Sequence, residues 1–444
     1  MGTKGEKMNY KYTEIMDFLR YEIDREVYKD KLPSIRALAI KFSCSNSTVI
    51  KAYNELESLG LVFSAPKSGY YINKSNKTDE KDLDFYSGVP DSFHLPIANL
   101  KKIMQIVLQE DNPVLFNYSY PKGYDLLREF ILMDLNQDDI ELDSVFITPG
   151  AQGAFNVILE SKKDQDEILI EDPSYNIFIT HLNKKKISYK KIHRDYSGID
   201  LESFEEILKT SSIKYFYTMS RNHNPLGDSL TIEQMEKIIA LSRTYDFYIV
   251  EDDYLEEFSK GPTFFSLAQD RTLYIRSYSK TISPALRLAH LIVPKNLVKD
   301  LTDTVTYLNY GASLIHQSVL LKYLKSEYYL WDMLNEKNRI KQNIMIFKNA
   351  IIDFPFPYHL PEAGFFASIE FPKDFKLKLL MENLESKGFR FRDFRGFTSN
   401  EDRKAMRISL SRVSPNAMNL AIKELTAQTF SMREEKDDVN KIYI

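Results

Sequence analysis

Apolar side chains recur at helical spacing in three segments near the start of the chain, beginning with residues 12–26. Ser34 and Ser45 precede the second and third segments, where each side chain can cap a helix, and Gly60 stands where the third helix is expected to stop. A Pro-Lys-Ser-Gly turn between short apolar runs then predicts a hairpin. Together these features predict a winged helix-turn-helix over residues 10–75, and its third helix has the size that enters a major groove. The predicted inward-facing residues are Ile15, Phe18, Leu19, Ile23, Ile35, Leu38, Ala39, Val49, Ala52, Leu56 and Leu59.

The rest of the chain has a different pattern. Residues 76–84 are polar, charged in both signs and without periodicity, which predicts a linker. Over residues 85–430, short apolar runs alternate with amphipathic segments, which predicts an α/β domain with a mostly parallel sheet. Residues 431–444 are strongly charged and are predicted to form a frayed C-terminal tail. Strands are predicted at 144–148, 167–171, 213–218, 248–251, 273–277 and 288–293.

Composition narrows the class of protein. The chain has 444 residues, of which 43% are hydrophobic and 27% charged, as in globular proteins. No apolar signal region opens the chain and no stretch of about 18 apolar residues occurs, so we expect a cytoplasmic protein. A single cysteine, Cys44, excludes an internal disulfide and a thiolate zinc site. The net charge is −4, but bases outnumber acids between Lys31 and Lys74, so a locally basic module is attached to an acidic body.

Chemically distinctive residues follow the predicted strands of the body, and ligands in such sheets bind at the carboxyl ends of strands. A glycine-bearing turn after the first strand opens a helix and exposes amides to a phosphate. Lys280 follows the fifth strand, where apolar neighbours and cations favour a neutral amine that forms a Schiff base with an aldehyde. The other strand ends carry an aromatic ring at Tyr175, the run 221–227, and acidic residues with a phenol at 251–255. Donors that can grip a phosphate near Lys280 are Ser277, Ser279 and Arg287.

One ligand accounts for this set of residues. A pyridine ring with a phosphate arm, an acidic ring nitrogen, a phenolic oxygen and an aldehyde requires an anion cradle, a carboxylate, a neutral donor, a stacking ring and a lysine. That ligand is pyridoxal 5'-phosphate (PLP).

The N-terminal module resembles the GntR superfamily of bacterial regulators. The resemblance is carried by Leu-Pro-Ser-Ile-Arg-Ala-Leu-Ala from residue 32, Ser-Asn-Ser-Thr-Val from residue 45, and Glu-Leu-Glu-Ser-Leu-Gly-Leu-Val from residue 55. Asn46 stands where the family commonly has arginine, a change that favours adenine over the usual guanine contact. The DNA contacts that the resemblance implies are Arg36, Ser45, Asn46, Thr48, Lys51, Lys67, Ser68 and Gly69.

The body resembles fold-type I, aspartate-aminotransferase-like domains. By that resemblance Lys280 is the lysine that binds the cofactor aldehyde, Asp252 pairs with the pyridine nitrogen, and Tyr175 stacks on the ring. Asn224 and Tyr254 are expected to hold the phenolic oxygen. The phosphate is expected to be held by the amides of Ala151 and Gln152, the hydroxyls of Ser277 and Ser279, and Arg287.

Two further roles follow from the same resemblance. Tyr118, in a segment resembling the family's Tyr-x-x-x-x-Gly, is expected to reach the cofactor phosphate of a partner subunit. Arg407, in Met-Arg-Ile-Ser-Leu-Ser, is expected to bind the carboxylate of an amino acid.

A GntR-like module fused to an aminotransferase-like body resembles the MocR subfamily of regulators. That resemblance implies a head-to-tail homodimer whose DNA readers respond to PLP, alone or together with an amine or amino-acid effector. A working aminotransferase with an accessory DNA-binding module is the alternative, and a DNA-binding protein with a cofactor-free body is a third, disfavoured because every cofactor position is filled. Asn136-Gln137 stands where such proteins often carry Arg-Gly, so the effector is held by Arg407 alone, or PLP itself is the signal.

Overall fold

A winged helix-turn-helix forms the N-terminal part of the computed structural model, and we call it the reader (residues 11–72). Ser34 caps the second helix by accepting a bond from the Ala37 N–H at 3.2 Å, and Ser45 Oγ accepts one from the Thr48 N–H at 3.3 Å. Both predicted caps are therefore present. Its elements are α1 (Lys11–Asp24), α2 (Ile35–Lys41), α3 (Asn46–Ser58), β1 (Val62–Ala65) and β2 (Gly69–Ile72). The structure describes residues 11–24, 27–58, 61–65, 68–72, 83–90, 95–135, 137, 139–308 and 311–442, so Leu59, Gly60 and Lys67 lie outside it.

Eight strands form the central sheet of the remainder of the chain, which we call the body (residues 83–442). In sheet order they are β4 (Val145–Thr148), β11 (Ala289–Ile292), β10 (Thr272–Ser277), β9 (Tyr248–Asp252), β8 (Ile213–Thr218), β5 (Glu167–Asp172), β6 (Tyr189–Asp195) and β7 (Gly198–Ile199). Strands β10, β9, β8, β5 and β6 are parallel, and β11 is antiparallel to both of its neighbours. The predicted α/β class with a mostly parallel sheet is confirmed, and all six predicted strands are present.

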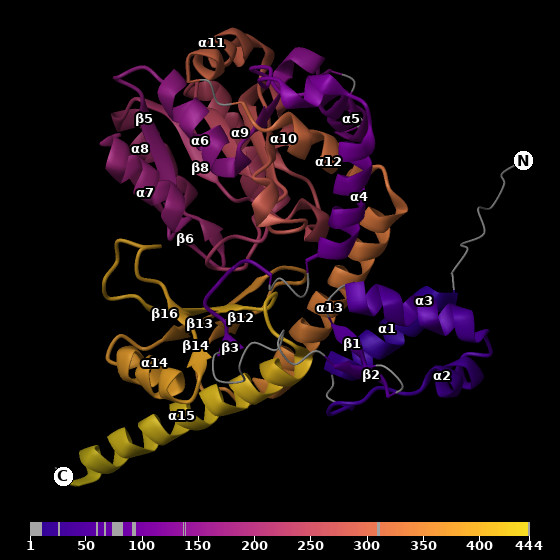
Figure 1. Ribbon diagram of the computed structural model, residues 1–444. Coiled ribbons are helices and arrows are strands. Elements are labelled where there is room, and N and C mark those ends of the chain that lie inside the picture. The colour runs from indigo at the N-terminus through magenta and orange to yellow at the C-terminus, as the bar shows by residue number, and fades with distance from the viewer. Residues whose placement is uncertain are drawn as a thin grey trace, which may run out of the picture.

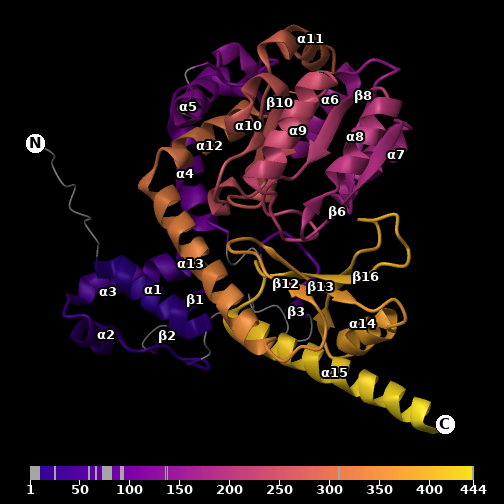
Figure 2. The same cartoon turned by 180° about the vertical axis from the view of Figure 1, so that it is seen from behind.

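Both faces of this sheet are buried under helices (Figures 1 and 2). In β8, Tyr215 and Tyr217 pack toward one core, while Phe216 between them packs into the other. Such two-sided burial explains why these strands read as nearly continuous apolar runs. One face carries α6 (Gly150–Ser161), α7 (Asn176–Lys185) and α11 (Val298–Leu308); the other carries α8 (Leu201–Thr210), α9 (Ile232–Thr244) and α10 (Phe264–Leu267); and α4 (Ile97–Gln109), α5 (Asp125–Leu135) and α12 (Leu314–Leu324) pack beside β4.

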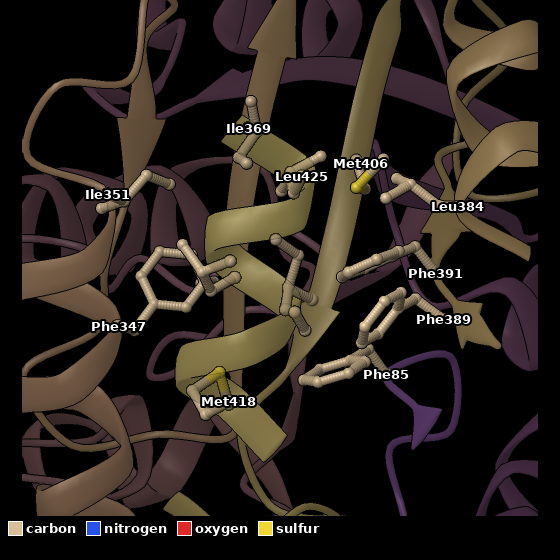
Figure 3. Packing of buried hydrophobic residues seen from close by; sticks show 14 of the residues in the cluster. Phe85, Phe347, Ile351, Ile369, Leu384, Phe389, Phe391, Met406, Met418 and Leu425 are labelled. Atoms are coloured by element: carbon tan, nitrogen blue, oxygen red, sulfur yellow. The ribbon is translucent and has the colours of Figure 1, made fainter. Parts of the chain in front are cut away.

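A second, smaller layer forms the C-terminal part of the body. Its sheet has the order β12 (Tyr358–His359), β13 (Phe366–Phe371), β16 (Lys404–Ser409) and β15 (Arg392–Asp393), and its helices are α13 (Glu327–Ala350), α14 (Leu377–Ser386) and α15 (Pro415–Ile442). The short strands β3 (Leu83–Asp84) and β14 (Phe389–Arg390) pair in parallel and join the first described residues of the body to this layer. Figure 3 shows its core, in which Phe85 stacks on Phe391 with ring centroids 5.0 Å apart, while Met418 and Leu425 of α15 face the sheet.

The structure differs from the sequence prediction in three places. Leu83 and Asp84, predicted as the end of the linker, form strand β3. The strands of the small sheet and β6 were not predicted, because β12 and β15 have two residues each and charged residues interrupt the apolar runs of β6, β13 and β16. The stretch predicted as a frayed tail from residue 431 continues α15 to Ile442. Its glutamates, lysines and arginine are good helix formers, so helix propensity continues where the apolar stripe ends. No helix in the described part of the chain is long and apolar enough to cross a membrane.

Candidate functional site

The carboxyl ends of β5, β8, β9 and β10 meet at one edge of the central sheet, because these strands are parallel neighbours. Each predicted cofactor residue that follows one of these strands is thereby brought to the same edge. The turn after β4 lies at the same edge. Because β4 is antiparallel to β11 and β11 is antiparallel to β10, β4 runs in the same direction as β10. The residues gathered there are Ala151, Gln152, Tyr175, Asn224, Asp252, Tyr254, Ser277, Ser279, Lys280 and Arg287.

Lys280 is the amine of this site. A Cβ built on Gly88 would lie 2.5 Å from the Phe366 ring and 3.7 Å from Lys280 Nζ, so the Phe366 ring beside the amine leaves room only for glycine at this position. Burial, together with the positive charge of Arg407, lowers the pKa of Lys280 to about 8, and Asp252 opposes the shift. A lysine held in this way supplies a neutral amine near neutral pH, as attack on an aldehyde requires.

Asp252 is buried and has one oxygen without a partner. Its Oδ2 accepts a bond from the Tyr217 hydroxyl at 2.9 Å, whereas Oδ1 has no hydrogen-bond partner within the described structure. Burial raises the pKa of this carboxyl to about 7, although the Tyr217 bond opposes the shift. A buried acceptor left unsatisfied is unfavourable unless a ligand donor completes it. The N–H of a protonated pyridine is such a donor, so the site fits the ring of PLP.

The other end of the site is suited to an anion. No side chain caps the first turn of α6, so the amides there, including those of Ala151 and Gln152, point outward. Arg287 is adjacent, because a Cβ on Gly150 would lie 3.4 Å from its Cζ, and it forms no ion pair with any described residue. Ser279 Oγ is buried without a partner among the residues that the structure describes. These groups fit a phosphate.

Asn224 and Tyr254 differ in what they leave free for a ligand. Arg407 donates to Asn224 Oδ1 at 2.7 Å, so the amide nitrogen of Asn224 is the group that remains to donate. The Tyr254 hydroxyl donates to the carbonyl of Asn222 at 2.7 Å. Its proton is therefore already engaged, and Asn224 is the better placed of the two predicted donors to a phenolic oxygen.

Tyr175 lies within the same electrostatic field. Burial and the nearby Asp252 carboxyl raise the pKa of Tyr175 to about 12, and Arg407, Arg287 and Arg392 oppose the rise. The Tyr175 phenol is thus close both to Asp252, which is expected to bind the ring nitrogen, and to the arginines at the other side of the site. A side chain that stacks on the ligand ring must lie between these groups.

Tyr118 is the one predicted cofactor residue that the fold does not bring to this edge. It lies between a 3₁₀ turn (Pro113–Phe116) and α5, and 94% of it is exposed. Contact with the cofactor of a partner subunit stays a prediction for this residue.

A buried charge network behind the site was not predicted from the sequence. Arg194, fully buried, donates to Asp228 Oδ2 at 2.9 Å, to Glu171 Oε1 at 2.5 Å and to the Met219 carbonyl at 3.0 Å. His223 Nε2 lies 3.1 Å from Glu171 Oε2. Because His223 and Asp228 flank the Asn224 loop, the network fixes that loop from behind. The sequence signal was weak: an arginine at the end of the charged strand β6.

The reader presents most of its predicted DNA contacts to solvent. Arg36, Ser45, Asn46 and Lys51 are exposed and Thr48 is half-buried, while Val49, Ala52 and Leu56 on the opposite side of α3 are buried. Ser68 and Gly69 at the wing are exposed as well. Lys51 is held on the ring of Tyr12, with its nitrogen 4.1 Å from the ring centroid. The exposed side of α3 is therefore available to DNA.

The lowered pKa of Lys280 predicts how PLP capture depends on pH. The neutral amine increases as pH rises through about 8, so the rate of covalent capture should rise up to that pH and level off above it. Arg407→Gln removes a cation that lowers this pKa, so the midpoint should move to higher pH. Stopped-flow absorbance after PLP is mixed with the protein measures the rate. Arg243→Gln, an exposed and distant substitution, should leave the midpoint unchanged, and a midpoint near that of an ordinary lysine would refute the assignment.

Known proteins match both parts of the chain. Residues 11–72 match the family described as bacterial regulatory proteins, gntR family, and residues 80–425 match aminotransferase class I and II. The uncharacterized HTH-type transcriptional regulator YcxD of Bacillus subtilis is 34% identical over 312 residues, which cover 68% of this chain and 70% of the relative. The HTH-type transcriptional regulator NorG of Staphylococcus aureus is 27% identical over 406 residues, covering 80% and 90%.

Solved structures support the fold of the body. Kynurenine aminotransferase from Pyrococcus horikoshii superimposes with a TM-score of 0.73 at 22% identity, covering 80% of this chain and 92% of that one. The α-aminoadipate aminotransferase LysN from Thermus thermophilus gives 0.73 at 20% identity, covering 85% and 97%. The chain therefore belongs to the class I and II aminotransferase family by its body and, because a GntR reader precedes that body, to the MocR-type GntR transcriptional regulators.

Proposed function

We propose that the protein is a cytoplasmic transcriptional regulator whose body binds PLP and senses it, alone or with an amine or amino-acid effector, and whose reader binds operator DNA accordingly. The observation that carries the proposal is the free Oδ1 of Asp252 at the same sheet edge as Lys280, an amine with a pKa of about 8. When bound, PLP supplies an aldehyde for amines and a ring that withdraws electrons. Lys280 holds it, Asp252 keeps its ring nitrogen protonated, Arg287 and the α6 amides bind its phosphate, and Arg407 orients the effector carboxylate.

The reader is in contact with the body, which gives the signal a route. Lys102 Nζ of α4 lies 2.6 Å from Glu55 Oε2 of α3, the helix expected to enter DNA. Arg20 of α1 is close enough to Asp332 of α13 to influence its pKa. Figures 1 and 2 show the reader beside α4 and α13, and α13 continues into the small layer that carries Arg407. A ligand that shifts this layer therefore acts on a helix that touches the reader.

A homodimer completes the proposal. Tyr118 is exposed next to other exposed aromatic residues, Phe116 and Tyr120, and Tyr307 is exposed as well. We infer that a head-to-tail partner covers this surface, so that Tyr118 reaches the partner's cofactor phosphate and two readers address paired half-sites.

Parallel titrations test the function. DNA selected from random duplexes for binding to the full-length protein serves as the operator probe. PLP, and then candidate amines, are titrated while protein absorbance and DNA affinity are followed together. We expect the DNA affinity to change by about 5- to 150-fold, the usual range for coupled sites. PLP binding with an unchanged DNA affinity would reject the sensor.

A working aminotransferase is the second candidate, because Lys280, Asp252 and Arg407 serve turnover as well as sensing. Incubation of the PLP-loaded protein with an amino acid and a 2-oxo acid separates the two candidates. Steady product formation would establish an enzyme with a DNA-binding module, whereas a single equivalent at most is expected of a sensor.

The contact between Lys102 and Glu55 predicts a variant with weakened coupling. Lys102→Gln removes a half-exposed ion pair, and such pairs contribute at most about 1 kcal/mol, so the PLP-induced change in DNA affinity should fall by up to about fivefold. The measurement is DNA affinity with and without PLP. Lys101→Gln on the exposed side of α4 is the matched control. An equal effect of both variants would mean that the contact does not transmit the signal.

A further inference from the structure

The small sheet turns one face toward the cofactor site and the other toward its own core. Ile369 of β13 and Met406 and Ile408 of β16 pack into the core shown in Figure 3. Ser368 and Arg407 alternate with them and therefore point to the opposite face. Ser368 Oγ donates to the Leu226 carbonyl at 2.6 Å, which places this face against the Asn224 loop.

Arg392 of β15 lies directly opposite Arg407 in the antiparallel ladder, so both side chains leave the same face of the sheet. Both guanidinium groups lie over the ring of Phe397, with Cζ 4.5 Å from its centroid for Arg392 and 5.2 Å for Arg407. Arg392 also lies 4.6 Å from the ring centroid of Tyr86. The two guanidinium groups thus stack on the same aromatic ring beside the cofactor site.

Like charges directly opposite each other destabilise a strand pair, yet no described acidic residue forms an ion pair with either arginine. Arg407 donates from two nitrogens, to Asn224 Oδ1 and to the Tyr86 carbonyl, and its buried Nε has no partner among the described residues. Arg392 makes no hydrogen bond to any residue that the structure describes. Burial has the largest effect on the pKa values of Arg407 and Tyr175, and the positive charge of Arg392 is close enough to lower both values. Arg392 therefore lies on the ligand side of the sheet. Two adjacent cations without internal compensation are suited to a ligand with two negative groups.

We propose that Arg392 and Arg407 form a paired subsite for an acidic amino acid, in which Arg407 binds the α-carboxylate and Arg392 the distal carboxylate. Cβ atoms of directly opposite residues are about 5 Å apart, a spacing that the carboxylates of a short dicarboxylic amino acid can match. Arginine binds a carboxylate through two parallel hydrogen bonds, and stacking on rings orients its plane. The proposal rests on the proposed function, because it names the effector class of the same site. Arg392 on β15 would then be the second carboxylate anchor, since Asn136-Gln137 stands where such regulators often carry Arg-Gly.

Titration of the PLP-loaded protein tests the pair. Alanine, 4-aminobutyrate, aspartate and glutamate are compared by the absorbance change that each causes. We expect wild type to bind aspartate or glutamate about 10- to 100-fold more tightly than alanine. Arg392→Gln should remove that preference and leave the affinity for alanine unchanged, and Arg392→Lys should keep part of the preference. Arg407→Gln should weaken the binding of all four amino acids.

A second measurement separates this proposal from the proposed function. Succinate, a dicarboxylate without an amine, is titrated by calorimetry into PLP-free wild type and into Arg392→Gln. Binding to wild type and its loss in the variant would support the pair even if PLP proved not to regulate DNA binding. Arg390→Gln is the matched control, since Arg390 lies 5.9 Å from the same Tyr86 ring but points toward Glu385. No preference for acidic ligands in wild type, or an equal loss for all ligands in Arg392→Gln, would overturn the proposal and leave Arg392 a stacking residue.

Discussion

Replacing Lys280 by alanine is expected to abolish covalent attachment of PLP. With a pKa of about 8, roughly a tenth of the Lys280 amines are neutral at pH 7, whereas an ordinary lysine has almost none. The phosphate-binding groups around Arg287 should still bind the cofactor weakly, but no covalent bond to it should form. Borohydride reduction followed by peptide mass mapping measures attachment. The PLP-dependent change in DNA affinity should disappear with it.

The variant should stay folded, because alanine removes a cation from a desolvated position and Lys280 forms no hydrogen bond or ion pair with any described residue. Asp252 loses a nearby positive charge, which raises the pKa of its carboxyl further above the ordinary value. Circular dichroism and DNA binding without PLP check this. Lys295→Ala is the control, since Lys295 is an exposed lysine paired with Glu141. Label found on another lysine of the Lys280→Ala protein, at wild-type yield, would show that the amine had been assigned wrongly.

The sequence predicted the position of Lys280 because the rule behind it is geometric and general. Parallel strands end at one edge, so residues just after apolar runs converge although they are far apart in the chain. Asp252 is the last residue of β9 and Lys280 follows β10, and these strands are neighbours in the sheet. The reader was predictable for a different reason: its caps, Ser34 and Ser45, are local signals.

Contacts that depend on register or on side-chain direction were not predictable. Arg392 meets Arg407 only because β15 pairs with β16 in one specific register, and a slip of one residue would turn Arg392 toward the core. Tyr217 looked like an ordinary core residue, and only its side-chain direction shows that it bonds Asp252. The pattern of apolar runs therefore predicts which residues reach an edge of the sheet, whereas the partners of these residues are defined only by the three-dimensional structure.

The Arg194 network illustrates this limit and provides the second large expected effect. Arg194 lies between the carboxylates of Glu171 and Asp228, and all three are buried. Arg194→Met keeps much of the side-chain volume but removes the charge that compensates them. Breaking a buried pair by removing one partner costs about 3–5 kcal/mol, far more than the pair contributes relative to an apolar substitute.

We therefore expect Arg194→Met to lower the free energy of unfolding of the body by about 3–5 kcal/mol and to loosen the Asn224 loop, so that PLP affinity falls as well. Urea unfolding followed by the fluorescence of Trp331, the single tryptophan, measures the first effect. Arg243→Met, which removes an exposed pair with Asp270, should cost about 1 kcal/mol or less.

The network also predicts how the stability of the body responds to acid. Burial alone would raise the pKa of Glu171, but Arg194 and His223 outweigh burial and hold this pKa at about 2, below the ordinary value for glutamate. The stabilisation that the Glu171 carboxylate contributes is therefore present above the ordinary pKa of glutamate and is lost as the pH falls toward 2. Equal unfolding midpoints for the two arginine variants would show that the buried charges contribute no more than surface charges, and the Asn224 loop would then need another support.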